Sequence, residues 1–162
     1  MKEAVVALGS NLCEREENLQ NAIIALKKLP VTAVEEISSI YETKPFQPPD
    51  CQDDYLNCCV KLQTELSPEM LLGACLGIES AMGRERPFKN AARIIDIDLL
   101  LYQGVSIDVA HLTLPHHRIK ERAFVMVPLS DLYKSKVALG LDFNVALSQV
   151  DVSQVKLYRE QV

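Results

Sequence analysis

Long hydrophobic runs and an excess of positive charge are both missing from this sequence of 162 residues. No stretch approaches the roughly 18–20 consecutive apolar residues of a membrane-spanning helix, and the N-terminus shows no apolar signal-peptide core with a cleavage site. Seventeen Lys plus Arg against 22 Asp plus Glu give a net charge of -5, which argues against a general binder of nucleic acids or anionic membranes. We therefore expect a cytoplasmic monomer with no nucleic-acid or membrane partner.

Common metal, thiol and nucleotide motifs are also missing. The five cysteines include no Cys-x-x-Cys pair, and the three histidines lack zinc-ligand spacing. A thiol nucleophile or a metal site is one reading of the cysteines, but we expect small buried side chains in a reducing compartment. Gly9-Ser10-Asn11 is not a P-loop, because no Gly-Lys-Ser/Thr follows it.

The sequence contains no internal repeat and no Gly/Ser linker, so we expect one domain over residues 1–162. Apolar and helical periodicity predict strand, helix, strand, strand, helix and strand at residues 5–8, 14–29, 33–43, 55–66, 68–82 and 94–102. This order predicts an α+β fold with a ferredoxin-like βαββαβ core, an antiparallel sheet with helices on one face, and additional C-terminal elements. Residues 124–133 predict a mixture of extended and helical turns. The proline-rich residues 44–54 predict a long loop, and loops of this length tend to be functional or mobile.

Two carboxylates stand out in the apolar segment Arg93-Ile-Ile-Asp96-Ile-Asp98-Leu-Leu-Leu. Side chains alternate along a strand, so Asp96 and Asp98 share one face and lie roughly 6.5–7 Å apart. Burying unpaired charge is costly, whereas Mg²⁺ binds one or two carboxylates together with phosphate oxygens. An edge strand with a solvated acidic face is the alternative.

Basic residues concentrate beside this acidic pair. Of the seven arginines in the chain, five fall between residues 84 and 122, namely Arg84, Arg86, Arg93, Arg118 and Arg122. Guanidinium groups bind phosphate oxygens as a fork, so arginines next to a carboxylate pair suit a metal–polyphosphate. His116 could donate to a phosphate, act as an acid or lie in a surface turn. A solvated basic loop is the alternative for the arginines.

A second group of residues is polar and aromatic. Thr43-Lys-Pro45-Phe46 opens the long loop, Tyr55 and Asn57 share one face of the following strand, and Phe124 comes after the basic segment. A flat heteroaromatic ring fits between aromatic faces, with the Asn amide reading its edge. Ordinary core packing explains the same residues equally well.

Together these segments resemble the 6-hydroxymethyl-7,8-dihydropterin pyrophosphokinases of folate synthesis. The likeness covers residues 7–129 and runs through Ala7-Leu-Gly-Ser-Asn-Leu12, Tyr41-Glu-Thr-Lys-Pro45, Tyr55-Leu-Asn57, Gly83-Arg-x-Arg86, Lys89-x-Ala-Ala-Arg93-x-x-Asp96-Ile-Asp98, Leu114-Pro-His116 and Arg122-x-Phe124. It implies a ferredoxin-like fold and transfer of the β,γ-diphosphate of ATP to the hydroxymethyl oxygen of the pterin, with release of AMP.

The resemblance also implies site residues. Asp96 and Asp98 would bind two Mg²⁺ ions held with ATP, and the catalytic set would be Arg84, Arg93, Asp96 and Asp98. The ATP-binding residues would be Glu79, Arg84, Arg86, Arg93, Thr113, His116 and Arg122. The pterin-binding residues would be Gly9, Thr43, Pro45, Phe46, Tyr55, Asn57 and Phe124. We expect Asp96→Ala and Asp98→Ala each to abolish turnover and leave the fold intact.

The sequence departs from the family pattern at four places: Asn90, Ala91-Ala92, His111 and His117. Two other functions remain open on residues alone. A two-metal hydrolase or nucleotidyl transferase could use the same acids and arginines, but has no use for the aromatic and amide residues. A ferredoxin-like RNA-binding module is opposed by the net charge and by the lack of an aromatic RNA-binding motif.

Overall fold

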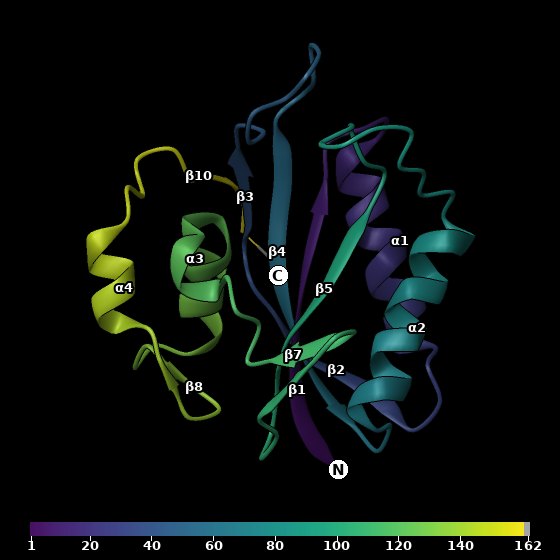
Figure 1. The fold of residues 1–162 in the computed structure, drawn as a ribbon, viewed down its shortest axis with the longest axis vertical. Coiled ribbons are helices and arrows are strands. Elements are labelled where there is room, and N and C mark those ends of the chain that lie inside the picture. The colour runs from purple at the N-terminus through teal and green to yellow at the C-terminus, as the bar shows by residue number, and fades with distance from the viewer. Residues whose placement is uncertain (161–162) are drawn as a thin grey trace.

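The fold is organised around one six-stranded antiparallel sheet, seen edge-on in Figure 1. The computed structural model describes residues 1–160. The strands lie in the order β10-β3-β4-β1-β5, and β2 pairs with β4 beside β3. Their bounds are β1 Lys2–Ser10, β2 Thr32–Ile37, β3 Ile40–Thr43, β4 Tyr55–Thr64, β5 Asp96–Tyr102 and β10 Lys156–Arg159.

Two helices cover one face of this sheet, α1 (Arg15–Lys27) and α2 (Pro68–Ala81) (Figure 1). The predicted start of α2 is confirmed, because the Ser67 hydroxyl accepts the Met70 N–H at 3.2 Å and Pro68 occupies the first turn. Apolar residues at helical spacing, such as Leu71 and Cys75, are fully buried against Val6 and other sheet residues. The predicted βαββαβ core with its helices on one face is therefore confirmed.

The additional C-terminal elements cover the opposite face of the sheet. Helix α3 (Ala123–Leu132) packs there on β4, burying Met126 and Leu129 against Val5 and Cys59. Residues 124–133 form this helix throughout most of their length, so the expected mixture with extended turns was wrong. Pro128 lies inside the helix, where it removes one hydrogen bond, but the burial on both sides of it keeps the helix continuous.

The second predicted strand is divided in two. Residues 33–43 form β2 and β3 because the chain turns at Ser38, whose hydroxyl accepts the Cys59 N–H at 2.8 Å. The Ser38 N–H in turn donates to the Cys59 carbonyl at 2.9 Å, which keeps both halves on β4. The remaining elements are β6 Ile107–Val109, β7 Leu112–Leu114, η1 Ile119–Glu121, β8 Val137–Ala138, β9 Leu141–Asp142 and α4 Asn144–Gln149.

All five cysteines are free thiols, and Cys58, Cys59 and Cys75 are buried. Burial raises the pKa of Cys58 to about 12, so this thiol stays protonated and unreactive at neutral pH. The expectation of small buried side chains holds for these three, whereas Cys13 and Cys51 are exposed. Within residues 1–160, no helix combines the length and apolar character that a membrane crossing requires.

Candidate active site

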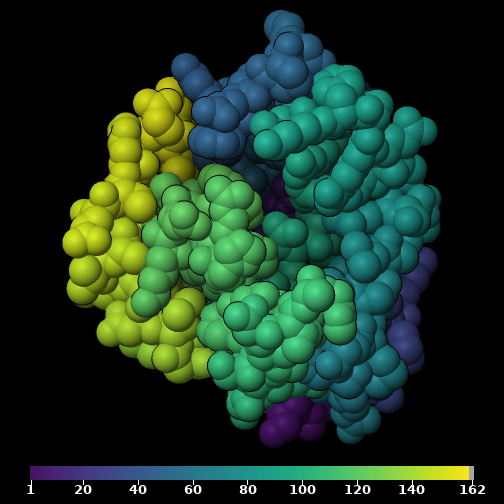
Figure 2. Space-filling model, viewed as in Figure 1, coloured from purple at the N-terminus to yellow at the C-terminus, as the bar shows by residue number. Residues whose placement is uncertain are grey.

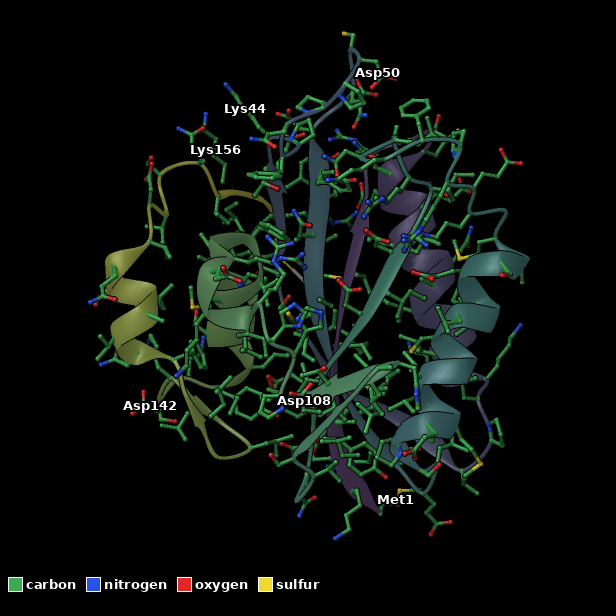
Figure 3. The ribbon with its side chains drawn as sticks, in the orientation of Figure 1. Met1, Lys44, Asp50, Asp108, Asp142 and Lys156 are labelled. Carbon is green, nitrogen blue, oxygen red and sulfur yellow. The ribbon has the colours of Figure 1, made fainter. Side chains whose placement is uncertain are left out.

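A cavity of about 420 Å³ opens at the end of the sheet where β1 and β3 finish and β4 and β5 begin. In Figure 2 a hollow is visible between the blue loop of residues 44–54, the teal loop before β5 and the green segment of α3. Figure 3 places Lys44 and Asp50 at this end of the molecule, with Met1 and Asp108 toward the other. The size is in the range of small-molecule sites.

Strand alternation determines which residues form the cavity floor. On the face that α3 covers, Leu100 and Cys59 belong to the buried cluster, and the same parity brings Asp98, Asp96 and Asn57 to the open end of that face. Helix α3 begins only at Ala123 and leaves these polar residues accessible to the cavity. In register, Gly9 pairs with Asn57 on one side and with Asp96 on the other. Asn57 and Asp96 are therefore two strand spacings apart, roughly 10 Å.

The acidic pair has the geometry that the sequence predicted. Asp96 and Asp98 both line the cavity, whereas Ile97 and Leu99 are buried on the opposite face. Asp96 accepts hydrogen bonds from Arg93, at 2.5 Å, and from Arg84. The Asp98 carboxylate lies 3.7 Å from the Arg122 guanidinium. Burial, together with the charge of Asp96, raises the pKa of Asp98.

Arg84 and Glu79 lie behind the cavity wall and do not line it. The Arg84 side chain is 8% exposed and lies 3.7 Å from the Glu79 carboxylate while it donates to Asp96. Glu79 accepts the Ile97 N–H at 2.7 Å, and burial raises the pKa of its carboxyl group. These two residues thus tie α2 to the start of β5 and fix the position of Asp96.

The other end of the cavity is formed by an amide and aromatic rings. The Asn57 side chain donates to the Thr43 hydroxyl at 2.8 Å, and this bond fixes the orientation of the amide. Tyr55, Pro45 and Phe124 also line the cavity. Phe46 lines it as well, with 70% of its surface exposed to solvent. Such an end presents flat apolar surfaces and a directed amide, as the recognition of a heteroaromatic ring requires.

Asn11 joins the two loops that border the cavity. It is 1% exposed, and its Oδ1 accepts the Arg93 N–H at 2.7 Å. Its Nδ2 donates to Gln52 Oε1 at 3.0 Å and to the Asp53 carbonyl at 3.2 Å. The Gln52 amide also donates to the Asn90 carbonyl at 2.8 Å. Residues 44–54 and 84–95 are thereby connected across the end of β1.

His116 lines the cavity on the side of Arg122. The Arg118 N–H donates to its Nδ1 at 3.2 Å, so the neutral ring carries its proton on Nε2. Burial, the nearby charge of Arg122, His117 and Arg118 lower the pKa of His116 to about 4. At neutral pH the ring is therefore an uncharged hydrogen-bond donor.

This shift predicts a loss of stability on mild acidification. Between about pH 6.5 and pH 4 the unfolded chain binds a proton at His116 that the folded chain does not bind, so the free energy of unfolding falls. Below pH 4 this contribution stays lost. We expect it to amount to about 2 kcal/mol, because solvent reaches part of the ring. Urea unfolding from pH 7 to pH 4 should show a shallower decline for His116→Asn, and equal slopes would contradict the assignment.

The cavity gathers most, but not all, of the predicted site residues. Those that line it are Gly9, Thr43, Pro45, Phe46, Tyr55, Asn57, Arg86, Arg93, Asp96, Asp98, His116, Arg122 and Phe124. Arg84 and Glu79 lie behind it. Thr113 lies on β7, where its hydroxyl donates to Asp108 at 3.2 Å, and it does not line the cavity.

The sequence analysis assigned no individual role to four lining residues: Lys44, Gln52, Asn90 and Glu121. Lys44 and Gln52 fall in the loop that was predicted to be functional or mobile. Arg118 also lines the cavity, and the sequence analysis placed it only among the arginines that suit a metal–polyphosphate. Periodicity could not identify these loop residues, because tertiary contacts and not a repeating backbone geometry determine the direction of loop side chains.

The two aspartates fit Mg²⁺ in their chemistry. Both are carboxylates on one strand face, both are accessible from the cavity, and hard cations prefer oxygen ligands. No cluster of three or more His, Cys, Asp or Glu side chains forms a metal site within the described part of the chain. The arrangement therefore suits ions that complete their coordination with phosphate oxygens and water.

Comparison with known proteins agrees with this geometry. The model of the family described as 7,8-dihydro-6-hydroxymethylpterin-pyrophosphokinase (HPPK) matches residues 5–134. The chain is 39% identical over 156 residues to a 2-amino-4-hydroxy-6-hydroxymethyldihydropteridine pyrophosphokinase of Methylorubrum extorquens, covering 96% of this chain and 98% of that relative. The chain belongs to the HPPK family.

Other relatives support the same conclusion. The HPPK of Haemophilus influenzae is 42% identical over 132 residues, which is 82% of either chain. A solved Plasmodium falciparum HPPK-DHPS with pteroate superposes with a TM-score of 0.74 at 14% identity, over 96% of this chain and 45% of that one, and this likeness concerns the fold. Both the predicted fold class and the family resemblance are confirmed. The chain is an enzyme, an ATP-dependent diphosphokinase with a role in folate biosynthesis.

Proposed function

We propose that the chain transfers diphosphate from ATP to the hydroxymethyl group of 6-hydroxymethyl-7,8-dihydropterin, releases AMP and requires Mg²⁺. One observation carries this proposal. A single cavity joins an amide and aromatic end, around Asn57, to an end of paired carboxylates and arginines, around Asp96. The first end suits a pterin ring and the second suits a metal–polyphosphate. The names of the relatives point to the same pterin.

The arrangement of charges supports the transfer step. The hydroxymethyl oxygen would attack the β-phosphorus, the bond from that phosphorus to the oxygen shared with the α-phosphate would break, and AMP would leave with the electron pair. Arg93 and Arg122 lie where they can neutralise phosphate oxygens, each beside one of the aspartates. Catalysis would then rest on positioning and charge neutralisation.

Asp96 and Asp98 would hold the Mg²⁺ ions that accompany ATP. When bound, Mg²⁺ would reduce the negative charge of the phosphates. His116 is a donor at neutral pH, because Nδ1 is occupied by the Arg118 N–H, so it would bind a phosphate oxygen and would not act as a base. The hydroxyl proton would leave to water, since this class of transfer needs little base assistance.

Product analysis tests the proposal. Purified protein would be incubated with ATP, Mg²⁺ and 6-hydroxymethyl-7,8-dihydropterin, and the nucleotides separated. We expect AMP in a one-to-one ratio with pterin diphosphate, and no turnover when EDTA is present. ADP in place of AMP would show that one phosphate is transferred and would contradict the diphosphate transfer. Nucleotide hydrolysis at the same rate with and without the pterin would favour the two-metal hydrolase.

Substituting Gly9 provides a test of the pterin end alone. A Cβ at this position would lie 3.2 Å from Asn57 Oδ1 and 3.6 Å from the Tyr55 ring, so both groups would have to move. We expect Gly9→Ala to raise the KM for the pterin about tenfold and to change the KM for ATP little. Gly73→Ala is the matched control, because its Cβ would meet nothing within 4 Å. Equal rises in the KM for the pterin and the KM for ATP would contradict the assignment of separate pterin and phosphate ends to the cavity.

The single-domain boundary, the monomeric state and the cytoplasmic location stay predictions of the sequence.

A further inference from the structure

Arg118 is a cavity-lining cation to which the proposed reaction gives no role. It precedes η1 and lines the cavity together with Glu121, His116 and Arg122. Its Nε lies 3.5 Å from Glu121 Oε2, and the two side chains are 45% and 65% exposed. Exposed pairs of this kind are weak, so Glu121 holds the guanidinium only loosely.

Three other arginines at this end pair with carboxylates that are less exposed than that of Glu121. Arg84 and Arg93 both donate to Asp96, and their side chains are 8% and 26% exposed. Arg122 is 22% exposed beside Asp98. Arg118 is therefore the more exposed cation, and it can change partner without leaving a buried carboxylate unpaired.

Groups that can donate hydrogen bonds to an anion lie close together on this side of the cavity. Burial and the charge of Arg118 lower the pKa of Arg122. The charge of Arg118 also contributes to the lowered pKa of His116. Two guanidinium groups and an N–H donor thus face the cavity within one short segment, opposed by Asp98 at 3.7 Å and Glu121 at 3.5 Å. A multivalent anion offers these donors more acceptor oxygens than the Glu121 carboxylate alone.

We propose that Arg118 is a further nucleotide-binding residue, whose guanidinium moves from Glu121 to the phosphates of ATP. This inference rests on the proposed function, which places the phosphates beside Arg122. Glu121 is the resting partner that Arg118 leaves when the nucleotide enters. Its carboxylate competes with the nucleotide phosphates for the Arg118 guanidinium.

The test compares steady-state kinetics and ATP binding by calorimetry for three variants and the wild type. Arg118→Gln should raise the KM and the Kd for ATP five- to tenfold, with kcat and the KM for the pterin nearly unchanged. Arg118→Lys should recover part of the affinity, because the charge is kept. Glu121→Gln should lower the KM for ATP about twofold.

Lys120→Gln is the matched control, because Lys120 is an exposed cation of the same turn that does not line the cavity. It should leave all constants unchanged, and thermal unfolding should be the same for every variant. An unchanged ATP affinity in Arg118→Gln, or an equal loss in Lys120→Gln, would overturn the inference while wild-type turnover still supported the proposed function. If the wild type showed no turnover but Arg118→Gln selectively lost ATP binding, the inference about Arg118 would stand and the proposed function would be contradicted.

Discussion

Asp98→Asn should lose at least about a thousandfold in kcat while the protein keeps its stability. The carboxylate of Asp98 is partly open to the cavity and its contact with Arg122 is long, at 3.7 Å. The amide keeps the shape of the side chain but removes the charge that would hold Mg²⁺. Steady-state assays and urea unfolding measure the two effects separately. Activity within tenfold of the wild type would contradict the metal assignment.

Asp96→Asn should lose activity to a similar degree and stability as well. Asp96 is the shared partner of Arg84 and Arg93, and Arg84 is nearly buried with its Nε lacking a hydrogen-bond partner. Removing the carboxylate leaves that guanidinium with only the more distant Glu79, at a cost of about 3 kcal/mol. The structure thus changes the expectation that replacing either aspartate leaves the fold equally intact.

Asn11→Ala should reduce kcat/KM about a hundredfold and lower the free energy of unfolding by about 2–3 kcal/mol. The Asn11 side chain forms hydrogen bonds with Arg93 in one loop and with Gln52 and Asp53 in the other. Among the described side chains, Gln52 provides the second connection, from its own loop to the Asn90 carbonyl. Loss of the Asn11 side chain would free Arg93 and both loops from their common support. Hydrogen exchange of residues 44–54 and 84–95 should increase in the variant.

Asn18→Ala is the control for this experiment. Asn18 lies in α1, and its amide donates to the Ser10 hydroxyl and the Leu12 carbonyl of the turn that contains Asn11, but it bonds to neither loop. Its replacement should affect stability modestly and leave exchange in the loops unchanged. If both variants lost the same activity, the effect would belong to the turn and not to the connection between the loops.

The sequence predicted the two halves of the cavity because strand alternation is a local rule. Once β5 was placed, Asp96 and Asp98 had to share a face, and Tyr55 and Asn57 followed in the same way on β4. The register that brings Gly9 between Asn57 and Asp96 could not be predicted, because it depends on pairing between strands far apart in the chain.

The role of loop residues was the main omission. Asn11 was part of a turn motif without a function, and Gln52 was one polar residue in a loop without periodicity. Their importance comes from hydrogen bonds that span 38 to 82 positions of sequence. Residues 124–133 were expected to mix extended and helical turns, whereas burial against Val5 and Cys59 stabilises a continuous helix that includes Pro128.

The borders of the sheet beyond β3 and beyond β5 offer little free backbone to a further strand. Beyond β3 lies β10, which is short and carries Lys156 and Arg159, with Arg159 paired to Glu16. Beyond β5 the chain returns so that the His116 N–H bonds to the Leu100 carbonyl at 2.8 Å. Short charged edges and satisfied backbone groups resist edge-to-edge aggregation. We therefore expect these two borders of the sheet to resist pairing with strands of another copy of the chain.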